Sequence, residues 1–394
     1  MPGPLHGYRI VDLTSMISGP LATMILADQG ADVIKVENPD GGDHTRAANN
    51  RRNGFSASFL NNNRNKRCVA LDLKNPAGLE AMLRLLGTAD VFVQNFRPGV
   101  ADRMGLGEDA VRAVSPEIIY VSISGFGEVG PYAQKPVYDP LIQGVSGLAS
   151  VQAGSDDEKP RLVRTIVPDK LTAYNAAQAI TAALLARERT GKGQHVRLSM
   201  LDAVIAFLWA SDMGSQTFVG EDIPQQEAAS FIDLIYETAT RPISAAVQTN
   251  REWTALTRAL DKPEWLEDSR FKTPALRQRH INDRLTMTQA EFLKRPAEEW
   301  LERLTAAGVP CAPVLTRTQM LSDPQVVAND IVVEMDHPRA GRIRQARSAA
   351  RFSGTPAKIR HGAQALGEQT REVLAELGYS PTDIEVLAGQ ERIA

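Results

Sequence analysis

Cysteine is scarce in this sequence, with only Cys68 and Cys311 among 394 residues. Two cysteines that lie far apart exclude a disulfide framework and a cysteine-based zinc site. The six histidines are scattered along the chain, with no pair at metal-ligand spacing. The sequence therefore predicts a cytoplasmic protein with reduced thiols and no metal site.

Long apolar runs and an excess of charge are also missing. No segment approaches the about 20 apolar residues needed to span a bilayer, and residues 1–6 lack the basic and apolar blocks of a signal peptide. A net charge of −3 gives no electrostatic reason to expect a nucleic acid or an anionic membrane as partner. An anionic ligand must therefore be bound by local basic clusters.

Several nucleotide-binding and hydrolase motifs are absent or incomplete. The sequence has no Walker A loop and no G-x-S-x-G elbow. Residues 125–130 match G-x-G-x-x-G, but Pro131 and Pro136 follow, so we expect a flexible loop and not the helix that a dinucleotide site requires. A nicotinamide-dependent dehydrogenase is disfavoured.

The sequence does contain a regular alternation of strand and helix signals. Such alternation predicts an open α/β fold with a parallel sheet. The apolar content of 43% is ordinary for a globular protein, and the length favours two folding units. We expect strands at residues 8–13, 31–37, 69–73, 91–93, 118–123 and 195–199, and helices at 19–29, 76–86, 98–104, 169–190 and 200–213.

A change in composition divides the chain. Residues 1–219 carry the alternating pattern, residues 220–230 are polar and predict a linker, and residues 231–325 predict a smaller α+β domain with its own aromatic core. Residues 326–394 contain β-like pieces and two short helices.

Asp169 begins a helix of small residues that ends at a glycine-rich turn. Its carboxylate has two possible roles. It can accept hydrogen bonds from the free backbone N–H groups of that helix, or it can attack an activated carbonyl. The local pattern alone favours the first role.

Basic and aromatic residues follow several predicted strands. Residues 61–67 are polar and basic, and Lys74, Arg97 and Arg103 come after neighbouring strands. They are either solvated loop residues or a site for several phosphate groups, because ligands of open parallel sheets bind at the carboxyl ends of the strands. Tyr138, followed by Asp139 in a proline-flanked loop, is more typical of an aromatic lid or anchor than of a base.

Taken together, these segments resemble the class III coenzyme A transferases, the CaiB/BaiF family, which includes formyl-CoA transferase. The resemblance covers nearly the whole chain in order. It is carried by Gly19-Pro20, residues 26–37, Gly42-Asp43, residues 65–67, 71–74, 95–99 and 124–127, Asp169, and residues 189–194, 308–314 and 366–368.

The resemblance implies an architecture. We expect a Rossmann-like large domain whose parallel sheet is built from both ends of the chain, with residues 326–394 returning to it after the inserted small domain. We also expect a homodimer whose two chains interlock.

The resemblance also implies an activity, the transfer of CoA from an acyl-CoA to a free carboxylic acid. Asp169 would form a mixed anhydride and then an aspartyl-CoA thioester, with CoA as substrate and no permanently bound cofactor. The side chain of Ile17 suggests an acid less polar than formate or oxalate. The residues expected to contact CoA or line its channel are Met16, Ile17, Lys74, Asn95, Phe96, Arg97, Arg103, Lys135 and Tyr138.

Two rival functions stay open. Alpha-methylacyl-CoA racemases share the expected fold but use a His, and Tyr138 stands at that position here; a two-base proton transfer needs groups that titrate near the working pH. A non-catalytic acyl-CoA binder would keep the basic residues and would tolerate loss of the Asp169 carboxylate.

Overall fold

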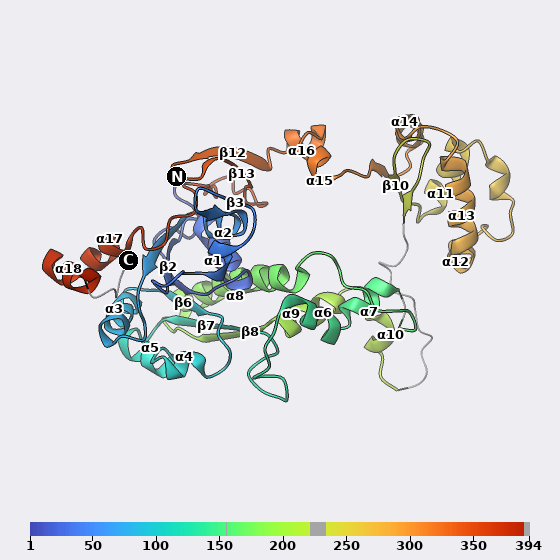
Figure 1. Ribbon diagram of the computed structural model, residues 1–394. Helices are drawn as coiled ribbons and strands as arrows, with labels where there is room; N and C mark the ends of the chain where they lie inside the picture. Colours follow the sequence, from blue (N-terminus) through green and yellow to red (C-terminus); the bar gives the residue numbers. More distant parts are fainter. Residues whose placement is uncertain (155, 221–233, 390–394) are drawn as a thin grey trace. The chain divides into compact units, whose positions relative to one another are not determined.

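The computed structural model describes residues 1–154, 156–220 and 234–389 and divides the chain into two compact units (Figure 1). One unit joins Met1–Phe231 to Ile331–Ala394, and the other is Ile232–Asp330. Apart from Gly220, the predicted linker at 220–230 lies outside the described residues. The second unit is therefore an insertion in the first.

The first unit is built on a six-stranded parallel sheet with the strand order β5-β2-β1-β6-β7-β8. The strands that follow β1 in the sequence, β2 and then β5, extend the sheet on one side of β1. The next strand, β6, pairs with the other side of β1. This reversal between β1 and β6 is the place where open α/β sheets bind ligands. The strands are β1 (Arg9–Leu13), β2 (Asp32–Glu37), β5 (Lys66–Ala70), β6 (Val91–Gln94), β7 (Ile119–Ser124) and β8 (His195–Ser199).

One predicted strand is displaced along the chain, whereas the ends of the others lie within one residue of those observed. The apolar alternation at residues 69–73 predicted a strand there, whereas β5 begins at Lys66 and ends at Ala70. The polar residues at the start of β5 can lie inside the sheet because their charges are paired with opposite charges, as described for Lys66 below.

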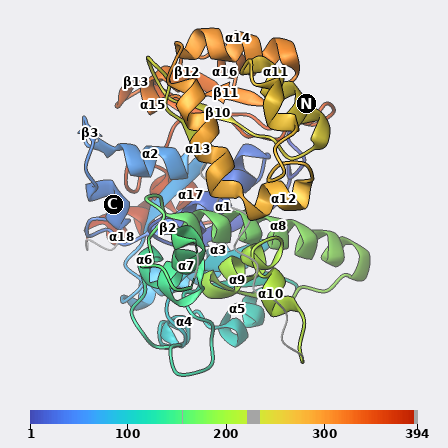
Figure 2. The same cartoon turned by 90° about the vertical axis from the view of Figure 1, so that its right-hand side faces the viewer.

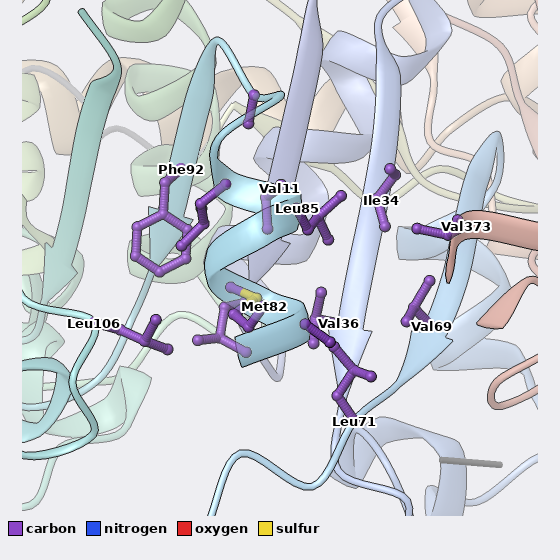
Figure 3. Close-up of a cluster of buried hydrophobic side chains, with 14 of the residues drawn as sticks. Val11, Ile34, Val36, Val69, Leu71, Met82, Leu85, Phe92, Leu106 and Val373 are labelled. Atoms are coloured by element: carbon purple, nitrogen blue, oxygen red, sulfur yellow. The ribbon is translucent and has the colours of Figure 1, made fainter. Parts of the chain in front are cut away.

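One face of the sheet is covered by α3 (Pro76–Leu86) and α5 (Glu108–Val114) together with the end of the chain. The last two helices, α17 (Thr370–Glu376) and α18 (Pro381–Gly389), add apolar side chains to this core, and Figure 3 shows Val373 beside Val69. Burying one such side chain contributes about 1.5–3 kcal/mol. The expectation of a sheet built from both chain ends is therefore wrong for the described residues: the C-terminal segment returns as helices that pack on the sheet, and every strand of the sheet lies before residue 200.

The opposite face is covered by α1 (Ser18–Asp28) and α8 (Val167–Thr190), which lie side by side (Figures 1 and 2). Their contact is rich in alanine, with Ala22 and Ala27 on α1 and Ala173 and Ala176 on α8, all fully buried. Small side chains let the two helix backbones approach closely. This packing sets the start of α8 next to the start of α1.

The remaining elements of the first unit surround this sandwich. No helix forms between Gly125 and Tyr138, which confirms that the glycine-rich segment is a loop. The helix predicted at residues 200–213 ends earlier, at Trp209. The elements are η1 (His44–Ala47), the hairpin β3 (Arg51–Arg52) and β4 (Phe55–Ser56), α2 (Ala57–Asn63), α4 (Val100–Arg103), α6 (Asp139–Val145), α7 (Leu148–Ala153), α9 (Met200–Trp209), α10 (Gly214–Thr217), and the hairpin β12 (Val332–His337) and β13 (Gly341–Ala346).

The second unit has an aromatic core of its own. Trp253, Phe271, Phe292 and Trp300 are buried together, and the Trp300 indole donates to the Phe292 carbonyl at 2.8 Å. These side chains lie between helices and a small antiparallel sheet. The elements are β9 (Ile235–Tyr236), β10 (Ile243–Ala245), α11 (Asn250–Ala259), η3 (Pro263–Leu266), α12 (Pro274–Arg279), α13 (Ile281–Phe292), α14 (Ala297–Ala307), β11 (Cys311–Pro313), α15 (Arg317–Met320) and α16 (Pro324–Ala328).

Candidate active site

The loop that leaves β1 is held in a strained conformation. Met16 has a φ of 70°, a value that residues other than glycine seldom adopt. The strain is compensated by neighbouring contacts. Asn95, just after β6, both accepts from the Ser15 N–H at 3.0 Å and donates to the Ser15 carbonyl at 2.8 Å, and Lys35 donates to the Thr14 carbonyl at 2.7 Å. The two strands that flank the reversal of the sheet are thereby tied together.

Buried charges beneath this loop form two ion pairs. Lys66 pairs with Asp12 at 2.9 Å and Lys35 with Asp43 at 3.0 Å, and all four side chains are almost completely buried. Burial alone would raise the pKa of the Asp12 carboxyl, but Lys66 and Lys35 hold it well below its usual range. Lys35 and Asp43 fix the backbone of the loop through the Thr14 carbonyl and the Met16 N–H.

This arrangement decides the role of the basic segment at residues 61–67. Neither of the two interpretations holds for its cations Arg64 and Lys66. Arg64 is buried against Asp28 at 2.7 Å, and Lys66 is fully buried against Asp12. These residues are internal counter-ions and neither solvated loop residues nor phosphate ligands.

Asp169 lies in the first turn of α8 and lines the same pocket as Ser18, the first residue of α1, whose backbone N–H and hydroxyl act to lower the pKa of the Asp169 carboxyl. The cap position of α8 is occupied by Ile166, which has no side-chain capping hydrogen bond. Gly19 lets the start of α1 lie against the loop that leaves β1, because a Cβ at Gly19 would lie 2.4 Å from the Cβ of Thr14. Ser18 thus gives the Asp169 carboxylate a polar neighbour other than the N-terminus of its own helix.

A second carboxylate lies beside Asp169. Asp139, at the start of α6, accepts from the Asp169 backbone N–H at 3.3 Å and from the Gln143 amide at 2.6 Å. Burial, followed by the charge of Asp139, raises the pKa of Asp169 to about 6, while the hydrogen bonds from Ser18 act in the opposite direction. At neutral pH the Asp169 side chain is mostly ionised, and it is more basic than an ordinary carboxylate.

Asp169 faces a pocket of about 170 Å³ at the carboxyl ends of β1, β6 and β7. The pocket contains an apolar part, formed by Phe126, Val137 and Met200, and two cationic side chains, Arg97 and Lys135. A neighbouring pocket of about 240 Å³ shares Phe96 with it and continues over the ends of β2 and β5 to Lys74. The two pockets together offer an apolar surface, cations and one basic carboxylate.

Comparisons with known proteins identify the family. The model of CoA-transferase family III matches residues 5–370. The chain belongs to this family. It is 33% identical over 390 residues to the succinyl-CoA:glutarate CoA-transferase of Mus musculus, covering 98% of this chain and 89% of the relative. It is also 33% identical over 412 residues to the formyl-CoA:oxalate CoA-transferase of Shigella sonnei, covering 98% and 99%.

A solved structure agrees with this assignment. The CaiB/BaiF family protein of Brucella suis superimposes with a TM-score of 0.82 at 30% identity, covering 96% of this chain and all of that one. The predicted resemblance is confirmed, and the protein is a class III CoA-transferase, an enzyme class whose substrates are CoA thioesters.

The predicted residues of this CoA-transferase fall into three groups. The pocket that contains Asp169 is also lined by Met16, Asn95, Phe96, Arg97, Lys135 and Tyr138. Lys74 lies in the neighbouring pocket. Ile17 precedes Ser18 at the start of α1, and Arg103 reaches back toward Gly99, so neither lines these two pockets.

Sequence reasoning missed Ser18 and gave Asp139 no electrostatic role. Both act on Asp169 from other elements of the fold. A serine next to Gly19-Pro20 at the start of the first helix was the available signal for Ser18, because a helix that begins at the carboxyl edge of a parallel sheet presents free N–H groups there.

Two absences hold for the residues that the structure describes, 1–154, 156–220 and 234–389. His, Cys, Asp and Glu side chains form no group of three or more suited to a metal ion within that part of the chain. None of its helices combines the length and the apolar character that crossing a bilayer requires.

Proposed function

We propose that Asp169 is the nucleophile that carries the acyl group and then CoA during transfer. The observation that supports this most is its position: a carboxylate with a pKa of about 6 lies beside the first residue of α1 and faces a pocket with an apolar part and two cations. A carboxylate that is both ionised at neutral pH and more basic than usual suits nucleophilic attack.

The proposed reaction proceeds through covalent intermediates. The Asp169 carboxylate attacks the thioester carbonyl, the C–S bond breaks, and the CoA thiolate leaves a mixed anhydride. The thiolate then attacks the Asp169 carbonyl, which releases the donor acid and leaves an aspartyl-CoA thioester. An incoming carboxylate repeats both steps in reverse order and departs as the new acyl-CoA. We propose that the N–H and hydroxyl of Ser18, which lines the same pocket and acts to lower the pKa of Asp169, stabilise charge on the Asp169 oxygens.

The CoA moiety is proposed to lie across the two pockets. Phe96, which lines both, offers an apolar surface, while Arg97, Lys135 and Lys74 offer positive charge for phosphate oxygens. Met16, Asn95 and Tyr138 line the part nearest Asp169. Arg103 and Ile17 lie close to this path and stay predicted contacts of CoA.

The acceptor is proposed to be a carboxylic acid with an aliphatic chain, and glutarate is the first choice. Relatives of this chain are named for glutarate and for oxalate. The apolar side chains of Phe126, Val137 and Met200 in the pocket favour the acid that carries methylene groups. A panel of acyl-CoA donors against glutarate, oxalate and monocarboxylates, read by mass spectrometry, tests this choice.

The protein is further proposed to be a homodimer with interlocked chains. Large apolar side chains are exposed on the first unit, among them Tyr174, Leu185 and Phe207, which are each at least half exposed. Such residues mark association surfaces in globular proteins. Light scattering gives the mass, and two differently tagged preparations mixed without denaturant should fail to exchange subunits if the chains are interlocked.

The decisive experiment replaces the nucleophile. Asp169→Ala should abolish CoA transfer while CoA still binds, and hydroxylamine added during turnover of the wild type should leave a hydroxamate on Asp169 that peptide mass spectrometry locates. Asp109→Ala, an exposed carboxylate at the start of α5, is the matched control and should change neither result. Unchanged turnover in Asp169→Ala would overturn the mechanism and leave a CoA binder or a different nucleophile.

The racemase alternative has a separate test. Tyr138 stands where a racemase has its His, and its side chain is largely exposed. A 2-methylacyl-CoA incubated in heavy water without an acceptor acid should gain no deuterium at the α-carbon. Deuterium incorporation there would favour isomerisation.

A further inference from the structure

A third cavity lies on the side of the Phe96–Pro98 segment that faces α4 and α5, and Asp169 does not line it. Its volume is about 280 Å³, and it shares only Phe96, Pro98 and Ser124 with the pocket of Asp169. Three of its lining residues come from separate elements: Glu108 from α5, Ser122 from β7 and His195 from β8. The transfer mechanism proposed above uses none of these three side chains.

These three side chains form a continuous hydrogen-bonded chain. The Ser122 hydroxyl lies 2.8 Å from Nε2 of His195, and Nδ1 of the same ring lies 2.6 Å from a carboxylate oxygen of Glu108. A nucleophile, a base within hydrogen-bond reach and an acid that orients the base are the three parts of a serine hydrolase site. Such a site is recognised by geometry and not by the order of its residues along the chain.

The residues around Ser122, His195 and Glu108 determine which atom donates each hydrogen bond between these three side chains. Glu108 also accepts from Arg112 at 2.8 Å. Although burial acts in the other direction, Arg112 and His195 hold the pKa of Glu108 below its ordinary value, so it stays a carboxylate and can only accept. Nδ1 of His195 must therefore donate to Glu108, which leaves Nε2 of a neutral ring as the acceptor of the Ser122 proton.

Gln94 completes the arrangement. Its Oε1 accepts from the Phe96 backbone N–H at 2.8 Å, which fixes the orientation of the amide, and its Nε2 donates to the Ser122 oxygen at 3.1 Å. The serine oxygen thus receives one hydrogen bond from Gln94 and keeps its own hydrogen for His195. The Gln94 amide is also the donor placed to stabilise a negative oxygen that forms next to Ser122.

We propose that Ser122, His195 and Glu108 form a second catalytic site, which hydrolyses small uncharged esters or thioesters. The Ser122 oxygen attacks the substrate carbonyl while His195 takes its proton. The bond to the alcohol or thiol then breaks, and His195 returns the proton to that leaving group. A water molecule, deprotonated by His195, attacks the acyl-serine, the serine ester bond breaks, and Ser122 recovers its proton as the acid departs.

Charge and size define the substrate class. The cavity is lined by three carboxylates, Asp102, Glu108 and Glu128, against one guanidinium, Arg197, which itself pairs with Glu128 at 2.8 Å. An acyl group that carries a carboxylate would be repelled. A volume of about 280 Å³ limits the site to short acyl groups. This selectivity is opposite to that proposed for the transferase pocket, where Arg97 and Lys135 favour anions.

The test uses the full-length protein and a chromogenic ester. Wild type should hydrolyse p-nitrophenyl acetate, and Ser122→Ala and His195→Gln should each reduce the rate by about 100-fold or more, as loss of a triad member does. Ser353→Ala, which changes an exposed serine that does not line the cavity, is the matched control and should keep the rate within about twofold. An ester with a terminal carboxylate should react more slowly than the acetate.

A covalent label separates catalysis from structural damage. A fluorophosphonate should modify Ser122 in the wild type and in Asp169→Ala, as located by peptide mass spectrometry, and Asp169→Ala should keep its full esterase rate. Hydrolysis that is unchanged in Ser122→Ala, or that disappears with Asp169→Ala, would overturn the proposal. So would a wild type that neither hydrolyses the ester nor takes the label. None of these results depends on whether Asp169 transfers CoA, so the two proposals fail separately.

Discussion

Replacing Asp169 by Asn should stabilise the folded protein at neutral pH. The folded structure raises the pKa of Asp169 to about 6, from an ordinary value of 3.8, because the side chain is buried and lies next to Asp139. Keeping it ionised in the folded state therefore costs free energy. An asparagine has nearly the same shape and carries no charge, so it avoids that cost.

The magnitude follows from the pKa. A difference of about 2 pKa units corresponds to about 3 kcal/mol at 1.36 kcal/mol per unit. Between pH 4 and pH 6 the folded wild type holds a proton that the unfolded chain has lost, so the stability of the wild type falls as the pH rises through this window. Above pH 7 the full difference of about 3 kcal/mol should separate variant and wild type, and below pH 4 the difference should vanish.

Scanning calorimetry at one protein concentration, from pH 4 to pH 8, measures this difference. A large domain shifts its melting temperature by about 2 °C per kcal/mol, so Asp169→Asn should melt about 6 °C higher than wild type at pH 7.5 and at nearly the same temperature at pH 4. A shift that is the same at every pH, or a variant that is less stable at pH 7.5, would refute the assignment of Asp169 as a destabilised carboxylate.

Three further predictions concern the surroundings of Asp169. Asp139→Asn removes a charge that raises the pKa of Asp169, so the acidic inflection of kcat/KM for an acyl-CoA should move below pH 6; an inflection that stays or rises would contradict this. Lys66→Met leaves the Asp12 charge buried without its partner and should cost about 3–5 kcal/mol in urea unfolding, whereas the exposed Lys192→Met should cost nothing measurable. Gly19→Ala forces a Cβ against Thr14 and should cost about 1–3 kcal/mol and impair transfer, while Gly144→Ala on α6, where a Cβ meets nothing within 4 Å, should be tolerated.

Much of the sheet could be predicted because its strands are short apolar runs bounded by turns. Residues 195–199 and 76–86 were predicted with the bounds that β8 and α3 have. The strand β5 was predicted too far along the chain because Lys66, at which it begins, is a residue more typical of loops. A fully buried lysine is only tolerated with a partner, and that partner, Asp12, lies on another strand. Local pattern carries no information about such a pairing.

The role of the C-terminal segment was misjudged for a related reason. Residues 370–389 form helices whose apolar side chains, such as Val373 and Leu374, complete the core over the sheet. The periodicity of the segment indicated helices, but a return to the large domain does not specify whether a segment adds a strand or covers a face. The segment covers a face because apolar side chains of the sheet beside α3 need to be buried. That apolar surface exists only once the sheet has folded (Figure 3).

The chemistry of the two sites depends on strand register, which the sequence does not state. In the sheet Gln94 lies opposite Ser122, and Tyr120 lies opposite His195. Side chains at alternate positions of a strand share a face, so this register sets Gln94, Ser122 and His195 on one side, and a slip of one residue would send Ser122 to the opposite face. The absence of a G-x-S-x-G elbow excluded one way of presenting a serine to a base. It could not exclude a serine and a histidine that meet because two parallel strands, more than 70 residues apart in the chain, are paired in this register.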